Sequence, residues 1–115
     1  MRVLIADDDP QMRTWLLRAL SGLGHYTEAV ADAETLVLRA VSFEPDAILS
    51  DIGLPGLDGI AAGLWVRRTR PRCRIVLMSG DLVRVEDARR AGFSEVLDKP
   101  FTLERLTAAF SAAGP

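Results

Sequence analysis

Short apolar runs that each end in polar or turn-forming residues recur along this chain and predict five buried strands. The first runs from Arg2 to Ala6 and breaks into Asp7-Asp8-Asp9-Pro10. The central run, residues 47–51, ends on Asp51, directly before a turn rich in glycine and proline. A short apolar run bounded by such turn signals is typical of a strand buried on both faces of a sheet. The remaining strands are predicted at 26–30, 74–78 and 94–97.

Between these runs, apolar residues recur at three- and four-residue spacing, which predicts helices with one buried stripe. The first helix is expected to have Asp9 as its cap and Pro10 at its first position. It should end at Gly24, where a left-handed turn suits glycine. The other helices are predicted at 32–41, from Asp58 or Gly59 to about 68, at about 82–91 and, after a Thr102 cap, at 103–110.

Strand and helix thus alternate along the whole chain with short connections. This order predicts an α/β fold in which a parallel sheet is covered by helices on both faces. With 115 residues, the chain forms one domain that is large enough to bury a core, and a second domain does not fit.

Composition narrows the function classes. The chain is 49% apolar and 26% charged with a net charge of -2, so it lacks the basic field that nucleic-acid binding usually needs. A single cysteine excludes an intrachain disulfide. Neither a leader pattern nor an apolar run of membrane-spanning length occurs, so we expect a cytoplasmic protein without a membrane or nucleic-acid partner.

The polar residues that end four of the predicted strands are expected to meet, because all strands of a parallel sheet open on one edge. They are Asp7 and Asp8, Asp51, Ser79 and Lys99. Crowded carboxylates repel one another unless a cation is supplied, and all-oxygen ligands suit magnesium. A hydroxyl, a lysine and a divalent ion around one aspartate are typical of a phosphoryl-transfer site, in which the carboxylate attacks phosphorus.

These residues and the motifs around them closely resemble the receiver domain of two-component response regulators. The motifs are Asp7-Asp8, Asp51 with Leu54-Pro55-Gly56-Leu57-Asp58-Gly59, Ser79-Gly80 and Lys99-Pro100-Phe101. They occur in the family's order, and the resemblance extends from about Arg2 to Phe110. It implies a five-stranded, flavodoxin-like, doubly wound sheet with five helices, and a receiver domain over residues 1–115.

The resemblance also implies a role for each site residue. Asp51 would accept a phosphoryl group from the histidine of a sensor kinase or a phosphotransfer protein. Asp8, Asp51 and the backbone carbonyl of Gly53 would bind Mg²⁺, with Asp7 helping through water, while Ser79 and Lys99 would contact the phosphoryl group. The domain would catalyse its own phosphorylation and dephosphorylation. It would signal to a downstream effector, or pair with a second copy through its fourth helix, fifth strand and last helix.

Some positions depart from the family pattern. Val96 stands where an aromatic switch residue is common, and the segment from Ser79 to Gly92 is a couple of residues short. Valine is stiff and cannot swing as a ring does, so we expect the signal to leave through the 79–81 loop and a shortened fourth helix. Gly53 and Asp81 flank the pocket. We also expect a cis bond between Lys99 and Pro100, since proline accepts cis at low cost.

Two other functions fit part of the pattern. A phosphatase of the haloacid-dehalogenase type also forms an aspartyl phosphate, at an Asp-x-Asp pattern that Asp7-Asp8-Asp9 imitates. Such enzymes usually need a longer chain with a cap. An interaction module that has lost phosphorylation is disfavoured because the acids, the hydroxyl and the lysine are all present. The receiver is either free-standing or a segment of a hybrid kinase or a longer regulator, and we expect no output domain on this chain.

Four further features have simple structural interpretations. His25 is expected at the surface or a boundary, and Cys73 as an inert thiol. A cluster of arginines near the end of the third helix is interpreted mainly as a solvent-exposed helix end that the helix dipole favours. Binding of an acidic partner is the alternative. Family phasing turns Ile60, Gly63 and Val66 of the third helix inward and leaves Leu64 and Trp65 outward. Scattered exposed apolar residues are normal, and a partner surface is the alternative interpretation of this pair. The basic cluster comprises Arg67, Arg68, Arg70, Arg72 and Arg74.

Overall fold

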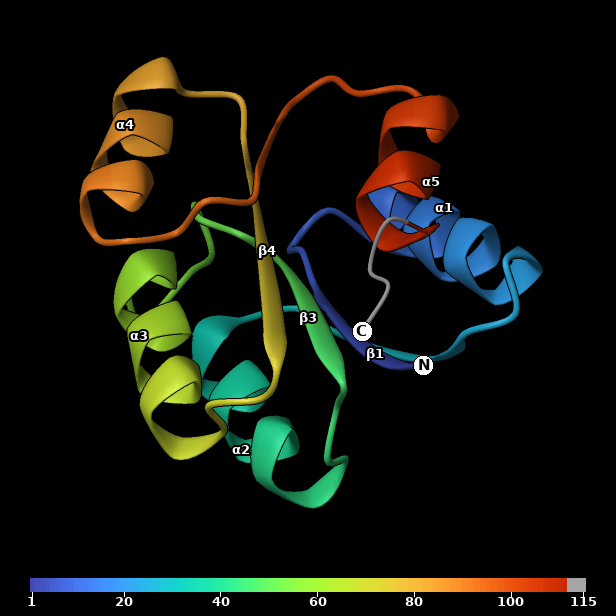
Figure 1. Cartoon of the computed structure of the whole chain (residues 1–115), viewed down its shortest axis with the longest axis horizontal. Coiled ribbons are helices and arrows are strands. Elements are labelled where there is room, and N and C mark those ends of the chain that lie inside the picture. The colour runs from blue at the N-terminus through green and yellow to red at the C-terminus, as the bar shows by residue number, and fades with distance from the viewer. Residues whose placement is uncertain (112–115) are drawn as a thin grey trace.

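The predicted strands form one parallel sheet in the computed structural model, which describes residues 1–111 (Figure 1). The strand order is β2-β1-β3-β4-β5, which is the flavodoxin-like order of a doubly wound sheet and confirms the predicted fold class. The strands are β1 (Arg2–Ala6), β2 (Tyr26–Val30), β3 (Ala47–Asp51), β4 (Arg74–Ser79) and β5 (Val96–Asp98).

Helices cover both faces of this sheet (Figure 1). Helices α1 and α5 pack on one face, where Leu16, Leu20 and Leu106 meet the side chains of β1, β3 and β4. Helices α2, α3 and α4 lie on the other face and bury Leu36 and Val85 among others. The helices are α1 (Pro10–Gly22), α2 (Ala33–Ser42), α3 (Gly59–Thr69), α4 (Leu82–Arg90) and α5 (Leu103–Ser111).

The predicted start and stop signals act as expected. The Asp9 carboxylate accepts a hydrogen bond from the backbone N–H of Gln11 at 3.0 Å, which caps α1. Gly24 and Gly92 follow α1 and α4 with φ angles of 93° and 99°, a left-handed region that glycine enters without a steric penalty. The Lys99–Pro100 bond is cis, as predicted.

The fifth strand differs from its predicted bounds of 94–97. It begins at Val96 and ends at Asp98, where Leu77 pairs with Val96 and Ser79 with Asp98. The reason lies in the preceding turn, since the chain is still bringing Phe93 into the core and leaves Ser94 exposed. The tail from Ala112 to Pro115, for which no further element was expected, lies outside the described residues.

The expected outward position of Leu64 and Trp65 is wrong in part. Both side chains are half-buried, Leu64 against the core between α3 and α4 and Trp65 against the core between α2 and α3. The physical reason is that α3 has a helical neighbour on each flank, so little of its circumference faces solvent. Ile60, Gly63 and Val66 are buried as predicted.

His25 lies at a boundary, as expected. Its side chain is half-buried, and its Nδ1 atom is 3.2 Å from the amino group of Met1. Partial burial, followed by the charge of that amino group, lowers the pKa of His25. Within residues 1–111, none of the helices has both the length and the apolar character to cross a membrane.

Candidate functional site

The predicted site residues meet at the carboxyl edge of the sheet. Asp7 directly follows β1, Asp51 ends β3, Ser79 ends β4, and Lys99 follows β5. From β1 the chain adds β2 on one side, and it then returns to add β3 on the other side of β1. The order in which strands are added therefore reverses between β1 and β3, although all strands remain parallel. Such a switch point leaves a crevice between helices on opposite faces, where α/β proteins bind ligands.

Three carboxylates form the acidic centre of the site. Asp7, Asp8 and Asp51 each offer an oxygen, and these atoms all lie within 4.8 Å of one another. Asp7 is fully buried, Asp51 is half-buried and Asp8 is exposed, so the cluster opens to solvent on the Asp8 side. Asp7 is held from several directions. Its Oδ1 accepts the backbone N–H of Asp9 at 2.9 Å, and its own N–H donates to the carbonyl of Val30 at 3.1 Å.

Lys99 joins two of these acids. Its Nζ atom lies 2.7 Å from Asp7 Oδ2 and 2.8 Å from Asp51 Oδ2. Burial acts to lower the pKa of Lys99, but hydrogen bonds to Asp51 and Asp7, together with their charges, outweigh it and raise the pKa above its ordinary value. The backbone N–H of Lys99 also donates to the carbonyl of Ser79 at 2.8 Å, which fixes the residue to β4. Lys99 is therefore a cation at neutral pH and is already in contact with Asp51.

Asp51 is oriented by two donors on different oxygens. Its Oδ2 accepts from Lys99, and its Oδ1 accepts the backbone N–H of Gly53 at 2.9 Å. A Cβ atom added to Gly53 would lie 3.6 Å from Asp51 Oδ1, so a side chain here would begin beside that oxygen. Glycine at this position leaves the approach to Asp51 open.

The Ser79 hydroxyl is bonded to its own loop. Its Oγ accepts the backbone N–H of Asp81 at 3.0 Å and donates to the carbonyl of Asp81 at 3.4 Å. The second bond is long, so the hydroxyl proton is weakly held. Ser79 can turn that proton to a new acceptor while it keeps the bond from Asp81.

Two arginines near the site were missed by the sequence argument. Arg13 of α1 donates from Nη1 to the carbonyl of Asp7 at 2.9 Å, and its place one turn after the Asp9 cap was a usable signal. Arg84 of α4 pairs with Asp58, in the loop that follows Asp51, and with Asp87 at 3.0 Å. No spacing rule points to the pairing of Arg84 with Asp58, because the two residues belong to different elements.

The sequence that forms this site matches a known protein family. The family model for the response regulator receiver domain matches residues 3–111. The chain belongs to this family. Receiver domains generally bind Mg²⁺ at an acidic pocket, and the cluster of Asp7, Asp8 and Asp51 has the corresponding all-oxygen donor set. The match also overturns the haloacid-dehalogenase alternative, which would put the nucleophile after β1 in a longer chain.

Similar proteins agree with this assignment. The transcriptional regulator NtrC of Azospirillum brasilense is 34% identical over 96% of this chain, which spans 24% of that protein. The regulatory protein TcrA of Mycobacterium tuberculosis is 32% identical over 100% of this chain, or 47% of its own length. The chain therefore spans less than half the length of these two relatives. NtrX of Brucella abortus, solved in complex with ADP, superposes with a TM-score of 0.89 at 28% identity over 97% of this chain and 26% of NtrX.

A CheY-like receiver domain protein from Methanospirillum hungatei matches along most of both chains. Its TM-score is 0.89, and it covers 96% of this chain and 90% of its own. At 23% identity, this likeness speaks for the fold alone. The receiver fold thus occurs both in a short protein of this kind and in part of longer regulators.

Proposed function

We propose that this receiver accepts a phosphoryl group on Asp51 from the phosphohistidine of a sensor kinase or a phosphotransfer protein. The observation that carries the proposal is the contact of Lys99 with both Asp51 and the buried Asp7 at the switch point of the sheet. It puts a fixed cation beside one half-buried carboxylate that is open to solvent on the side of Gly53 and Asp8.

In the proposed step, an oxygen of Asp51 attacks phosphorus while the bond from phosphorus to the donor imidazole nitrogen breaks. The electron pair of that bond goes to the imidazole, which takes up a proton. The phosphoryl oxygens gain an electrostatic partner in Lys99, whose ammonium already lies 2.8 Å from Asp51 Oδ2. The Ser79 hydroxyl gives up its long bond to Asp81 and donates to a phosphoryl oxygen.

The acidic cluster fits magnesium. We assign Asp8, Asp51 and the backbone carbonyl of Gly53 as its ligands, with Asp7 acting through water. Both oxygens of Asp7 already accept hydrogen bonds, one from Lys99 and one from the Asp9 backbone, which suits an outer role. When bound, magnesium supplies positive charge against the phosphoryl oxygens. Without it, Asp7 and Asp51 share the ammonium of Lys99, and Asp8 lies beside them with no cation partner among the described residues.

The signal is proposed to leave through the 79–81 loop and α4, which runs for 9 residues. Val96 at the aromatic switch position is buried and lies opposite Leu77 of β4, and its stiff β-branched side chain cannot swing as a ring does. The downstream effector would meet this surface. A second copy is a further candidate partner through α4, β5 and α5, because Leu82, Val83 and Leu103 expose 73%, 67% and 50% of their surfaces there.

The proposal is tested by incubating the protein with acetyl phosphate and magnesium and measuring its intact mass. One added phosphoryl group is expected in the wild type and none in Asp51→Asn. Asp46→Asn is the matched control, since it removes a carboxylate at the opposite edge of the sheet and should leave phosphorylation unchanged. Retention of the added mass in Asp51→Asn, or its recovery on a peptide containing Asp7, would contradict the assignment.

A further inference from the structure

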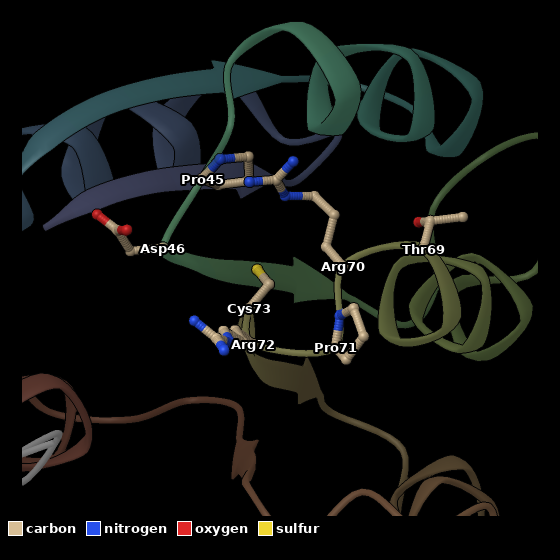
Figure 2. A pocket seen from close by; sticks show the side chains of 7 residues that line it. All are labelled: Pro45, Asp46, Thr69, Arg70, Pro71, Arg72 and Cys73. Atoms are coloured by element: carbon tan, nitrogen blue, oxygen red, sulfur yellow. The ribbon is translucent and has the colours of Figure 1, made fainter.

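A hollow of about 380 Å³ lies at the amino edge of β3 and β4, at the opposite end of these strands from Asp51. Figure 2 shows its lining side chains, which come from two loops and the end of α3. Pro45 and Asp46 belong to the loop between α2 and β3. Thr69 is the last residue of α3, and residues 70–73 form the connection from α3 to β4. No step proposed for the phosphoacceptor edge uses these residues.

The five arginines of the basic cluster have different environments in the structure. Arg67 donates to the carbonyls of Ala91 and Gly92, and Arg74 forms an ion pair with Glu95. Arg70 and Arg72 line the hollow, and within the described residues neither side chain has a hydrogen-bond or ion-pair partner. The Nε atom of Arg70 is also buried and has no hydrogen-bond acceptor among the described residues.

The other polar groups of the hollow are neutral or already engaged. Asp46 Oδ2 accepts the backbone N–H of Arg2 at 2.8 Å. The Cys73 thiol points into the hollow between the two loops (Figure 2). Burial raises the pKa of this thiol to about 11, with Arg70 acting to lower it and Asp46 to raise it. The thiol is therefore neutral near pH 7. Arg70 and Arg72 approach the hollow from either side of Cys73 (Figure 2), and Asp46 is the one carboxylate among the residues that line it.

From this arrangement we propose that the hollow binds a carboxylate, with Arg70 and Arg72 as its donors. A planar guanidinium matches a planar carboxylate with two parallel hydrogen bonds. Since no hydrogen bond among the described residues fixes the Arg70 side chain, it is free to turn its unpartnered Nε–H towards a carboxylate in the hollow. Pro45 and Pro71 offer apolar surface for the hydrocarbon next to the carboxylate.

The local charges favour a carboxylate over a phosphate. A carboxylate brings one negative charge, whereas a phosphate group brings about two. Asp46 stands at the rim, and the hollow adjoins the carboxyl end of α3, where the helix dipole is negative. Both features repel a dianion about twice as strongly as a monoanion. The ligand is therefore a small carboxylic acid or an acidic side chain of a peptide, which have the same chemistry at this site.

The test is an NMR titration of the ¹⁵N-labelled protein that follows the Nε–H signals of its arginines and the amides of Asp46 and Cys73. Acetate and succinate serve as free carboxylates, a capped Leu-Asp-Leu peptide as the peptide source, and inorganic phosphate as the competing anion. We expect saturable shifts of the Arg70 signal with at least one carboxylate, at lower concentration than with phosphate. Which carboxylate saturates first distinguishes the two sources.

Variants then decide whether the arginines bind the ligand. Arg70→Gln and Arg72→Gln should each weaken binding by about tenfold or more, the effect of removing a charge-assisted hydrogen bond. Arg68→Gln removes an exposed charge from the last turn of α3, outside the hollow, and should bind as the wild type does. Labelling of Asp51 by acetyl phosphate reports whether each variant is folded. If Arg70→Gln is not folded, Arg70→Lys takes its place. Stronger binding of phosphate, unchanged binding in Arg70→Gln, or no saturation with any carboxylate would overturn the proposal.

Discussion

Replacing Asp8 by asparagine should stabilise the magnesium-free protein, although it removes a proposed metal ligand. The Asp8 side chain is exposed and accepts no hydrogen bond from the described residues, while its oxygen lies within 4.8 Å of those of Asp7 and Asp51. Its main effect in the absence of a cation is therefore repulsion. Asparagine has nearly the same shape and removes that repulsion.

The size of the effect follows from the geometry. Two unit charges 4.8 Å apart repel by about 0.9 kcal/mol even at the dielectric constant of water. Asp8 has two such neighbours, and the attraction of Lys99 offsets part of the sum, so we expect a net gain of about 1 kcal/mol in the free energy of unfolding. In a domain of this size that corresponds to a rise of about 4 °C in Tm. The gain should shrink as salt screens the charges.

The assay is urea unfolding at low ionic strength, followed by circular dichroism, with EDTA or with saturating magnesium. Magnesium should stabilise the wild type, by about 1.4 kcal/mol at ten times its Kd, and should leave Asp8→Asn almost unchanged. Asp9→Asn is the matched control. It removes the same charge one residue along the chain, but asparagine still caps α1, so stability should hardly change. A less stable Asp8→Asn protein, or one that magnesium stabilises as much as the wild type, would refute the electrostatic argument.

Two further predictions concern the output segment and the half-buried thiol of Cys73. When beryllofluoride and magnesium bind, the largest amide chemical-shift changes outside the pocket should fall between Ser79 and Arg84. Ser79→Ala should suppress these changes, because the loop loses its hydroxyl. Comparison of amide chemical shifts with and without beryllofluoride checks this, and large shifts on β5 and α5 with a quiet 79–84 segment would contradict it. Iodoacetamide should alkylate Cys73 in the folded protein roughly a hundredfold more slowly than a free thiol at pH 8, since its pKa is raised from 9.0 to about 11. The unfolded thiol ionises first as pH rises through 9.0, so the contribution of the half-buried Cys73 thiol to stability should be lost between pH 9.0 and about 11 in pH-dependent unfolding. Alkylation of Cys73 as fast as that of a free thiol would contradict the raised pKa.

The sequence carries most of the fold because its signals are local. Asp51 ends an apolar run before a glycine- and proline-rich turn, so its place at the edge of the sheet follows from neighbouring residues alone. The same is true of the Asp9 cap and the Gly24 stop. Parallel strands then bring Asp7, Asp51 and Lys99 to one edge without further information, since all their strands point the same way.

What the sequence could not provide depends on contacts between distant elements. The contact of Lys99 with Asp7 joins residues that are 92 positions apart in the sequence. Only the structure shows that Lys99 lies as close to Asp7 as to Asp51. The sequence did not distinguish the five arginines of the basic cluster from one another. In the structure, Arg67 and Arg74 have partners on other elements. Leu64 and Trp65 were misjudged for a similar reason, because burial on a helix flank depends on which helices stand beside it.

The pair formed by α3 and α4 limits how α4 can move. Arg84 ties the first turn of α4 to Asp58 at the start of α3. At the other end, Arg67 of α3 holds the carbonyls of Ala91 and Gly92 and lies 4.4 Å from the centre of the Phe93 ring. Sliding α4 along its axis would break both ties, whereas a tilt would break only the exposed one at Arg84. A tilt of α4 about the contacts of Arg67 would therefore displace its first turn, next to Ser79, more than its last turn.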